Sequence, residues 1–127
     1  MNTQLESQFN LVSTRLLAIL RTYADGNLSM RIDKPNQFEF IGPATTRSRG
    51  KEVWFGAVRI GKNYVSYHLM PVYACPDLLK EISPELKKRM QGKSCFNFTQ
   101  VDEKLFKELA DLTEQGYKRF KKEGFIR

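Results

Sequence analysis

Histidine, tryptophan and cysteine are scarce in this sequence, and the scarcity of cysteine excludes two kinds of architecture. The 127 residues include one histidine, one tryptophan and two cysteines. Cys75 and Cys95 are too few for the disulfide framework of a small secreted domain, and neither has neighbouring ligands that would indicate a zinc site. We therefore expect two reduced thiols, as in a cytoplasmic protein.

Long hydrophobic runs are also missing. The first 20 residues have no basic segment, and polar residues such as Gln4, Glu6, Asn10 and Arg15 interrupt their apolar positions. Neither a signal peptide nor a membrane span fits this pattern, because both need an unbroken apolar stretch. By elimination, the sequence predicts a cytoplasmic protein that has no membrane as a partner.

Acidic residues are outnumbered, and the imbalance is local. The sequence has 21 Lys plus Arg against 14 Asp plus Glu, a formal net charge of +7. Residues 44–101 hold ten basic and four acidic side chains, so six of the seven surplus charges lie there. A charged partner of this protein is therefore expected to be an anion or an acidic surface rather than a cation.

The pattern of apolar residues predicts one α+β domain over residues 1–127. Helical spacing predicts a first helix over residues 5–24 and a last helix from about Asp102. Alternation and turn residues predict strands at 28–33, 37–41, 53–60, 64–72 and 94–98, with two short helices between the last two. The expected fold is a two-layer antiparallel sheet of about five strands, packed by the N-terminal and C-terminal helices, in the order α-β-β-β-β-α-α-β-α.

The strands at 53–60 and 64–72 allow a prediction of register. A two-residue turn at Lys62-Asn63 pairs Ile60 with Val65, Val58 with Tyr67, and Gly56 with Leu69. These residues and Trp54 are expected to face the core. The opposite face then carries a mixture of apolar and polar side chains that a purely solvated face would not need: Phe55, Ala57, Arg59, Ser66, His68 and Met70.

The candidate ligand-binding residues come from that second face and from a basic loop before it. They are Phe55, Arg59, Ser66, His68 and Met70, with Arg47 and Arg49 from the loop at residues 47–51 as a candidate lid. Such a loop can cradle a phosphate or carboxylate, although it lacks the Walker pattern. His68 is the only histidine, and nothing places an acid or a thiol beside it. We therefore expect a non-enzymatic domain without catalytic residues, cofactor or metal.

Three phrases of the sequence are similar to a known family. They are Trp54-Phe55-Gly56-Ala57-Val58-Arg59-Ile60, Tyr64-Val65-Ser66-Tyr67-His68-Leu69-Met70-Pro71-Val72-Tyr73, and Leu86-Lys87-Lys88-Arg89-Met90-Gln91-Gly92-Lys93-Ser94-Cys95-Phe96-Asn97-Phe98. Together they resemble the YdhG-like family of small bacterial domains of unknown function, over about residues 25–125. The resemblance implies that the chain shares the architecture of this family, and it implies little about an activity. One branch of the family, described as frataxin-like iron chaperones, would imply iron delivery.

Three hypotheses of function follow. The leading one is a binding or interaction domain that takes a small anionic ligand or a protein partner on one sheet face. An iron chaperone would need clustered carboxylates, for which Glu108, Asp111 and Glu114 are the best candidates, at a spacing that also fits a solvated helix face. A nucleic-acid binder would combine aromatic residues with the basic residues at 47–51 and 87–93.

Overall fold

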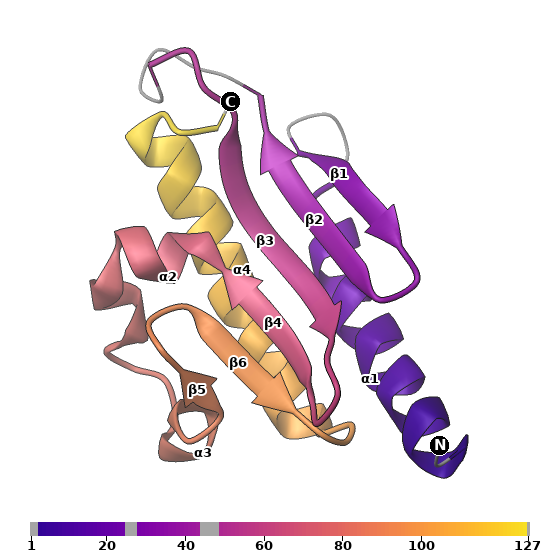
Figure 1. Cartoon of the computed structure of the whole chain (residues 1–127). Coiled ribbons are helices and arrows are strands. Elements are labelled where there is room, and N and C mark those ends of the chain that lie inside the picture. The colour runs from indigo at the N-terminus through magenta and orange to yellow at the C-terminus, as the bar shows by residue number, and fades with distance from the viewer. Residues whose placement is uncertain (1–2, 25–27, 44–48, 127) are drawn as a thin grey trace.

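The computed structural model describes residues 3–24, 28–43 and 49–126. In chain order its elements are α1 (Thr3–Arg21), β1 (Ser29–Lys34), β2 (Gln37–Gly42), β3 (Val53–Ile60), β4 (Val65–Leu69), α2 (Met70–Ala74), η1 (Pro76–Leu79), α3 (Pro84–Lys87), β5 (Met90–Gln91), β6 (Cys95–Phe98) and α4 (Glu103–Glu123). The strands form one antiparallel sheet in the order β1-β2-β3-β4-β6-β5 (Figure 1). The predicted α+β class and the two flanking helices are confirmed. The short helix α2 and the short strand β5 are additions to the predicted order.

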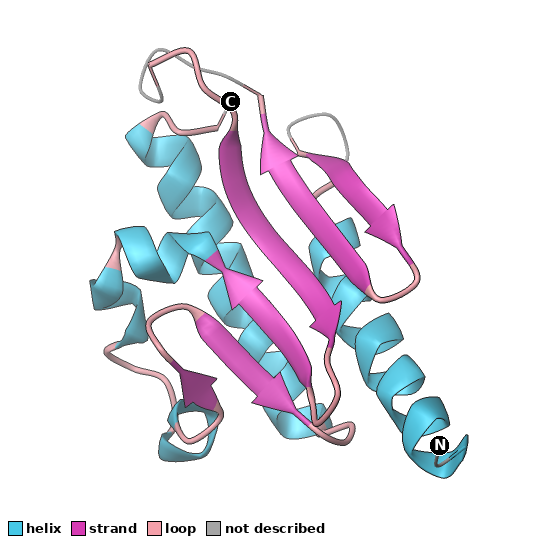
Figure 2. Ribbon diagram, in the orientation of Figure 1, coloured by secondary structure: helices cyan, strands magenta, loops and turns pink. Residues whose placement is uncertain are grey.

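The two long helices lie on the same face of the sheet. Both α1 and α4 run behind the strands in Figure 2, whereas no helix of the described residues crosses the front. The short helices α2, η1 and α3 gather at the side of the sheet that ends in β5 (Figure 1). We call the covered side the helix face and the opposite side the outer face. None of the helices in the described ranges is both long and apolar enough to cross a bilayer.

The core fills the space between the helix face and the two long helices. The apolar spacing predicted for the first helix is confirmed at Phe9, Val12 and Leu16, which are buried, whereas the helix ends at Arg21, three residues before the predicted end at residue 24. Burying each such large side chain contributes about 1.5–3 kcal/mol. The sheet and the last helix contribute the remaining large side chains of this cluster, among them Phe40, Val58, Tyr67, Leu69, Phe96, Phe98, Leu105, Leu109, Leu112 and Phe120.

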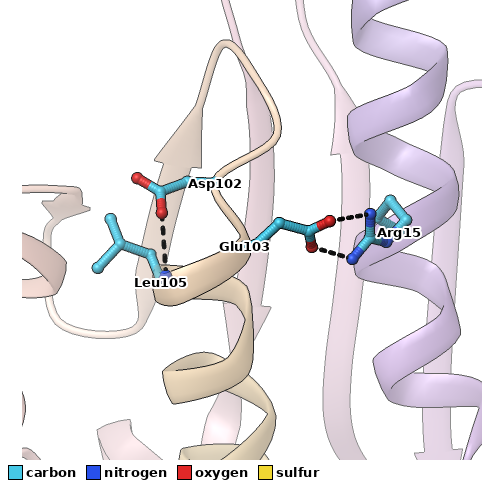
Figure 3. A network of polar contacts seen from close by, with 4 residues as sticks. All are labelled: Arg15, Asp102, Glu103 and Leu105. Atoms are coloured by element: carbon cyan, nitrogen blue, oxygen red, sulfur yellow. Dashed lines mark hydrogen bonds and ion pairs between the residues drawn. The ribbon is translucent and has the colours of Figure 1, made fainter.

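The start of α4 is tied to α1 by polar contacts. Asp102 caps the helix, because its carboxylate accepts a hydrogen bond from the Leu105 amide at 3.1 Å. The next residue, Glu103, forms a two-pronged ion pair with Arg15 of α1 (Figure 3). The guanidinium lowers the pKa of Glu103. Both side chains are exposed, so water screens the pair and its main effect is to orient the two helices.

The predicted register between β3 and β4 is confirmed. Ile60 pairs with Val65, Val58 with Tyr67, and Gly56 with Leu69. The pairing of β3 with β2 contains an irregularity that the sequence did not indicate, because Phe40 pairs with Gly56 whereas Ile41 pairs with Trp54. Phe55 is therefore one extra residue in β3, which makes a β-bulge.

The bulge reverses the expected positions of two aromatic residues. Phe55 is fully buried on the helix face, against the rings of Tyr23, Tyr117 and Phe120. Trp54 lies on the outer face, with its ring centroid 5.7 Å from that of His68. The predictions that Trp54 faces the core and that Phe55 lies on the binding face are both wrong, since strict alternation cannot accommodate an inserted residue.

Met70 is also misplaced in the sequence prediction. The strand ends at Leu69, and α2 begins at Met70 with Pro71 in its first turn, where a missing backbone N–H is tolerated. Met70 packs at the edge of the core cluster. It belongs to a helix and not to the sheet face, so its prediction as a ligand-binding residue of that face is wrong.

Gly116 lies inside α4, where glycine costs about 1 kcal/mol of helix propensity relative to alanine. The reason for glycine is the close approach of α2. A Cβ atom at this position would lie 2.7 Å from the Cβ and 3.0 Å from the Cγ of Pro71. The absent side chain therefore allows α2 to pack directly on α4.

We expect Gly116→Ala to lower the free energy of unfolding by about 1–3 kcal/mol, because the overpacking penalty exceeds the gain in helix propensity. The neighbouring exposed residue Gln115 supplies the control, and Gln115→Ala should change stability by less than about 0.5 kcal/mol. Urea unfolding followed by circular dichroism measures both variants. A Gly116→Ala protein that is more stable than the parent would contradict the proposed contact.

A buried hydroxyl pair joins the sheet to α4. The oxygens of Tyr67 and Thr113, two residues with no solvent exposure, lie 2.6 Å apart. The Thr113 hydroxyl also lies 2.8 Å from the Leu109 carbonyl oxygen, to which it donates. Since that proton is already used, Tyr67 donates to Thr113. Burial raises the pKa of Tyr67, so the phenol remains a donor.

This order of donors predicts an asymmetry between two variants. Thr113→Val leaves the buried Tyr67 hydroxyl without an acceptor and should cost about 1–3 kcal/mol of stability. Tyr67→Phe removes one hydrogen bond but leaves Thr113 bonded to Leu109, so it should cost only about 0.5–1.5 kcal/mol. Guanidinium unfolding of the two variants tests the order, and a costlier Tyr67→Phe would show that the direction of donation is reversed.

Candidate functional site

The outer face presents its side chains in rows that cross the strands. Paired residues of neighbouring strands point to the same face, so the register defines each row. The first row consists of Lys34, Gln37, Arg59, Ser66 and Asn97. The second row consists of Ile32, Glu39, Ala57, His68, Cys95 and Gln91. Beyond the second row, Ile41 and Trp54 form a further pair.

A groove of about 480 Å³ opens on this face, and we call it the sheet groove. Three predicted ligand-binding residues, Arg59, Ser66 and His68, line it together. The other lining residues come from the turn after β3 and from the edge of the sheet: Gly61, Lys62, Asn63, Tyr64, Gln91 and Cys95. The structure therefore brings together residues from four strands and one turn.

The remaining predicted site residues lie elsewhere. Phe55 is in the core and Met70 is in α2, as described above. Arg49 is exposed, has a left-handed backbone conformation with φ of 59°, and does not line the groove. Arg47 lies outside the described residues. The candidate lid is therefore not part of the site that the structure defines.

Amide and hydroxyl groups along the groove are bonded to one another. The Asn97 carbonyl oxygen accepts hydrogen bonds from the Ser66 hydroxyl at 2.8 Å and from the Cys95 thiol at 3.2 Å. The Gln91 carbonyl oxygen accepts from the Asn97 amide nitrogen at 2.7 Å and from the Tyr64 hydroxyl at 3.3 Å. Each of these two oxygens thus accepts two hydrogen bonds, which is its full capacity.

Unpaired donors remain on the same surface. Arg59 and Lys62 are exposed, and neither forms an ion pair within the described chain. The Gln91 amide nitrogen also has no partner among the described residues. Glu39 is the only carboxylate in the two rows, and it accepts a hydrogen bond from the Gln37 amide at 3.3 Å. The groove therefore offers donors and positive charge, while the amide oxygens of Asn97 and Gln91 are already occupied.

His68 is half-buried, and its surroundings favour the neutral ring. Burial lowers the pKa of His68, the charge of Arg59 lowers it further, and Glu39 opposes these effects. At neutral pH the imidazole is therefore uncharged, with one nitrogen able to donate and the other able to accept.

Cys95 is a neighbour of His68 that sequence reasoning missed, since no thiol was expected beside the histidine. The two residues are directly paired between β4 and β6. Burial raises the pKa of the Cys95 thiol, whereas the neighbouring Ser66 hydroxyl opposes the shift. A protonated thiol is a poor nucleophile, so this pair lacks the activated thiolate that a Cys-His catalytic pair uses.

Trp54 is the second residue of the outer face that sequence reasoning missed. Its ring packs against His68, and its register partner Ile41 is buried. The indole Nε1 is buried without a hydrogen-bond partner in the part of the chain that the structure describes. Buried donors are rarely left in this state, so the missing acceptor needs an explanation.

The carboxylates considered for iron point to different parts of the molecule. Glu108 accepts hydrogen bonds from the backbone amide and the hydroxyl of Ser83, at 2.6 and 2.7 Å. Asp111 and Glu114 line a separate groove of about 500 Å³ between α1 and α4, and Glu114 pairs with Lys118 at 3.6 Å. Within the described ranges, no group of three or more histidine, cysteine, aspartate and glutamate residues is arranged to hold a metal ion.

Comparison of the chain with protein-family models, with curated proteins and with solved structures finds no match. The resemblance to the YdhG-like family, and the iron delivery that one of its branches implies, therefore remain expectations from the sequence.

The only tryptophan of the chain lies beside its only histidine, which allows the titration of His68 to be followed by fluorescence. A protonated imidazole quenches a neighbouring indole. We expect emission to fall on acidification with a midpoint below the ordinary histidine pKa of 6.5, because burial and Arg59 lower the pKa of His68. Over this interval the unfolded chain binds a proton before the folded chain, so stability should also fall as the pH decreases.

Two variants separate the causes of the shift. His68→Gln should remove the transition in emission, and Arg59→Gln should move the midpoint upward by removing a repulsive charge. A wild-type midpoint at or above pH 6.5 would be inconsistent with the described surroundings of the ring.

Proposed function

We propose that this protein is a cytoplasmic, non-enzymatic binding domain that holds a phosphate- or carboxylate-bearing ligand in the sheet groove. The observation that carries the proposal is the positive charge in the groove that has no carboxylate partner among the described residues. The Asn97 and Gln91 carbonyl oxygens are saturated by internal hydrogen bonds, whereas Arg59 and Lys62 have no carboxylate partner in the described chain. A ligand that supplies only acceptors complements such a surface.

Arg59 is the main anchor in this proposal. Its guanidinium presents a planar fork of donors that matches the two oxygens of a carboxylate or phosphate. Lys62, in the turn after β3, adds a second charge at the rim of the groove. The hydrogen bonds among Ser66, Asn97 and Gln91 hold the facing wall in place, so little side-chain freedom is lost when a ligand binds.

The size of the groove favours a small ligand or a segment of a larger one over a whole protein surface. Its volume of about 480 Å³ falls within the range of about 300–1,000 Å³ that is usual for small-molecule sites. Protein interfaces instead use broad patches that bury about 800 Å² on each partner.

Titration with inorganic phosphate and with acetate, followed by amide chemical shifts, tests the proposal. We expect the resonances of Lys62, Ser66 and His68 to move, and Arg59→Ala to weaken phosphate binding by about tenfold, the usual effect of losing a charge-assisted hydrogen bond. Arg21→Ala is the matched control, because Arg21 is an exposed arginine at the end of α1, on the covered side of the sheet. Shifts that are confined to other surfaces, or an unchanged affinity in Arg59→Ala, would refute the proposal.

A further inference from the structure

Ring-bearing side chains adjoin the basic row on the outer face. Tyr64 reaches the Gln91 carbonyl oxygen, His68 lies in the second row, and Trp54 packs against His68. The first row carries Lys34 and Arg59, and Lys62 follows in the turn. Stacking rings beside a line of positive charge are the two components with which proteins bind single-stranded nucleic acids.

The separation of the rows fits one nucleotide. Successive residues on one face of a strand are about 7 Å apart, so His68 lies about that far from the row that contains Arg59. A phosphate on the first row and a base over the His68 ring would be connected by a single sugar. Glu39, the only carboxylate of the two rows, lies in the second row and is thus kept out of the phosphate row.

The spacing of the charges favours a nucleic-acid strand over a single phosphate group as the ligand. Lys34 is on β1 and Arg59 is on β3, two strand spacings or about 10 Å apart. One phosphate group cannot contact both side chains, whereas successive phosphate groups of a nucleic-acid strand can. No helix of the described residues lies in front of the outer face (Figure 1).

The unpartnered indole of Trp54 is an independent observation that points to a missing ligand. Its Nε1 is a buried donor without an acceptor, and no hydrogen bond to the described chain holds the ring in its present position. Every nucleobase carries acceptor atoms on its edges and an aromatic face. A base that stacks near Trp54 could supply the acceptor after a small rotation of the indole.

We infer that the sheet groove and the adjoining Trp54 bind single-stranded nucleic acid, with phosphates along Lys34, Arg59 and Lys62 and bases stacked over His68 and Trp54. The inference rests on the proposed function, because it names the ligand of the same groove. Binding would be tolerant of base sequence, since ring stacking uses the face that all bases share.

Oligonucleotides with and without bases test the inference in the full chain. The probes are a labelled deoxythymidine strand of about 12 nucleotides, within the usual site sizes of about 4–16 nucleotides, and an abasic strand of the same length. Fluorescence anisotropy should give an affinity for the thymidine strand at least about tenfold higher than for the abasic strand, because stacking contributes to each bound base. The thymidine strand should also quench Trp54.

Variants of Trp54 separate stacking from charge. Trp54→Leu should lower the affinity for the thymidine strand by about tenfold, close to the affinity for the abasic strand. The same variant should leave the affinity for inorganic phosphate unchanged. Trp54→Phe keeps a ring and should retain most of the affinity, which also shows that the site tolerates a change at this position. Tyr73→Leu is the control, because Tyr73 is 55% exposed on α2, outside both rows.

Each outcome decides between the two proposals. If phosphate binds through Arg59 but the thymidine and abasic strands bind equally well, the proposed function stands and this inference fails. If a glutamate peptide of equal charge competes as well as the thymidine strand, the inference also fails, since the surface is then a general anion binder. If neither phosphate nor the oligonucleotides bind the groove, both proposals fail.

Salt dependence supplies a further measurement on the same samples. The logarithm of the affinity for the thymidine strand should fall linearly with the logarithm of the salt concentration. Lys34→Ala and Arg59→Ala should each reduce that slope by about one, as expected when a single phosphate contact is lost. If the slopes of both variants match the slope of the parent protein, the phosphates do not contact Lys34 and Arg59, and their assignment to the first row is wrong.

Discussion

The extra residue that β3 inserts at Phe55 determines which aromatic ring belongs to the core and which to the outer face. Phe55 touches Tyr23 after the end of α1 and both Tyr117 and Phe120 of α4, so one inserted residue connects the central strand to both helical regions. The same insertion turns Trp54 to the other side, next to His68. Without the bulge, Trp54 would enter the core and the outer face would lose its largest ring.

The two faces of the sheet differ in how they are covered, because helices pack closely on the helix face and no helix of the described residues covers the outer face (Figure 2). At Gly56 a Cβ atom would lie 2.8 Å from a methyl carbon of Leu20, and at Gly116 it would collide with Pro71. These two glycines let α1 approach the sheet and α2 approach α4. Both long helices lie on that side, and on the outer face Ser66, Asn97 and Gln91 form a hydrogen-bonded network.

Local sequence patterns predicted the helices and strands well. The errors come from a β-bulge and from the pairing of strands that are distant in sequence. The Lys62-Asn63 turn and period-two alternation were enough to place Ile60 opposite Val65, and the last helix begins after Asp102, as predicted from its apolar spacing. A bulge changes the count by one residue and leaves no signature in the apolar pattern, so Phe55 and Trp54 were exchanged. The pairing of His68 with Cys95 joins strands that are far apart in sequence, which periodicity within each strand cannot reveal. Arg59, Ser66 and His68 were brought together because they alternate on strands whose register the turn had determined.

Burial is the main cause of the lowered pKa of His68, and the charge of Arg59 adds to it. The guanidinium has no carboxylate partner within the described chain, and its charge helps to keep the imidazole neutral. An anion bound to Arg59 would offset that charge and thereby raise the pKa of His68. By linkage, protonation of His68 must then strengthen the binding of the anion by the same factor. The histidine would thus be coupled to anion binding through the arginine, even without a contact to the anion.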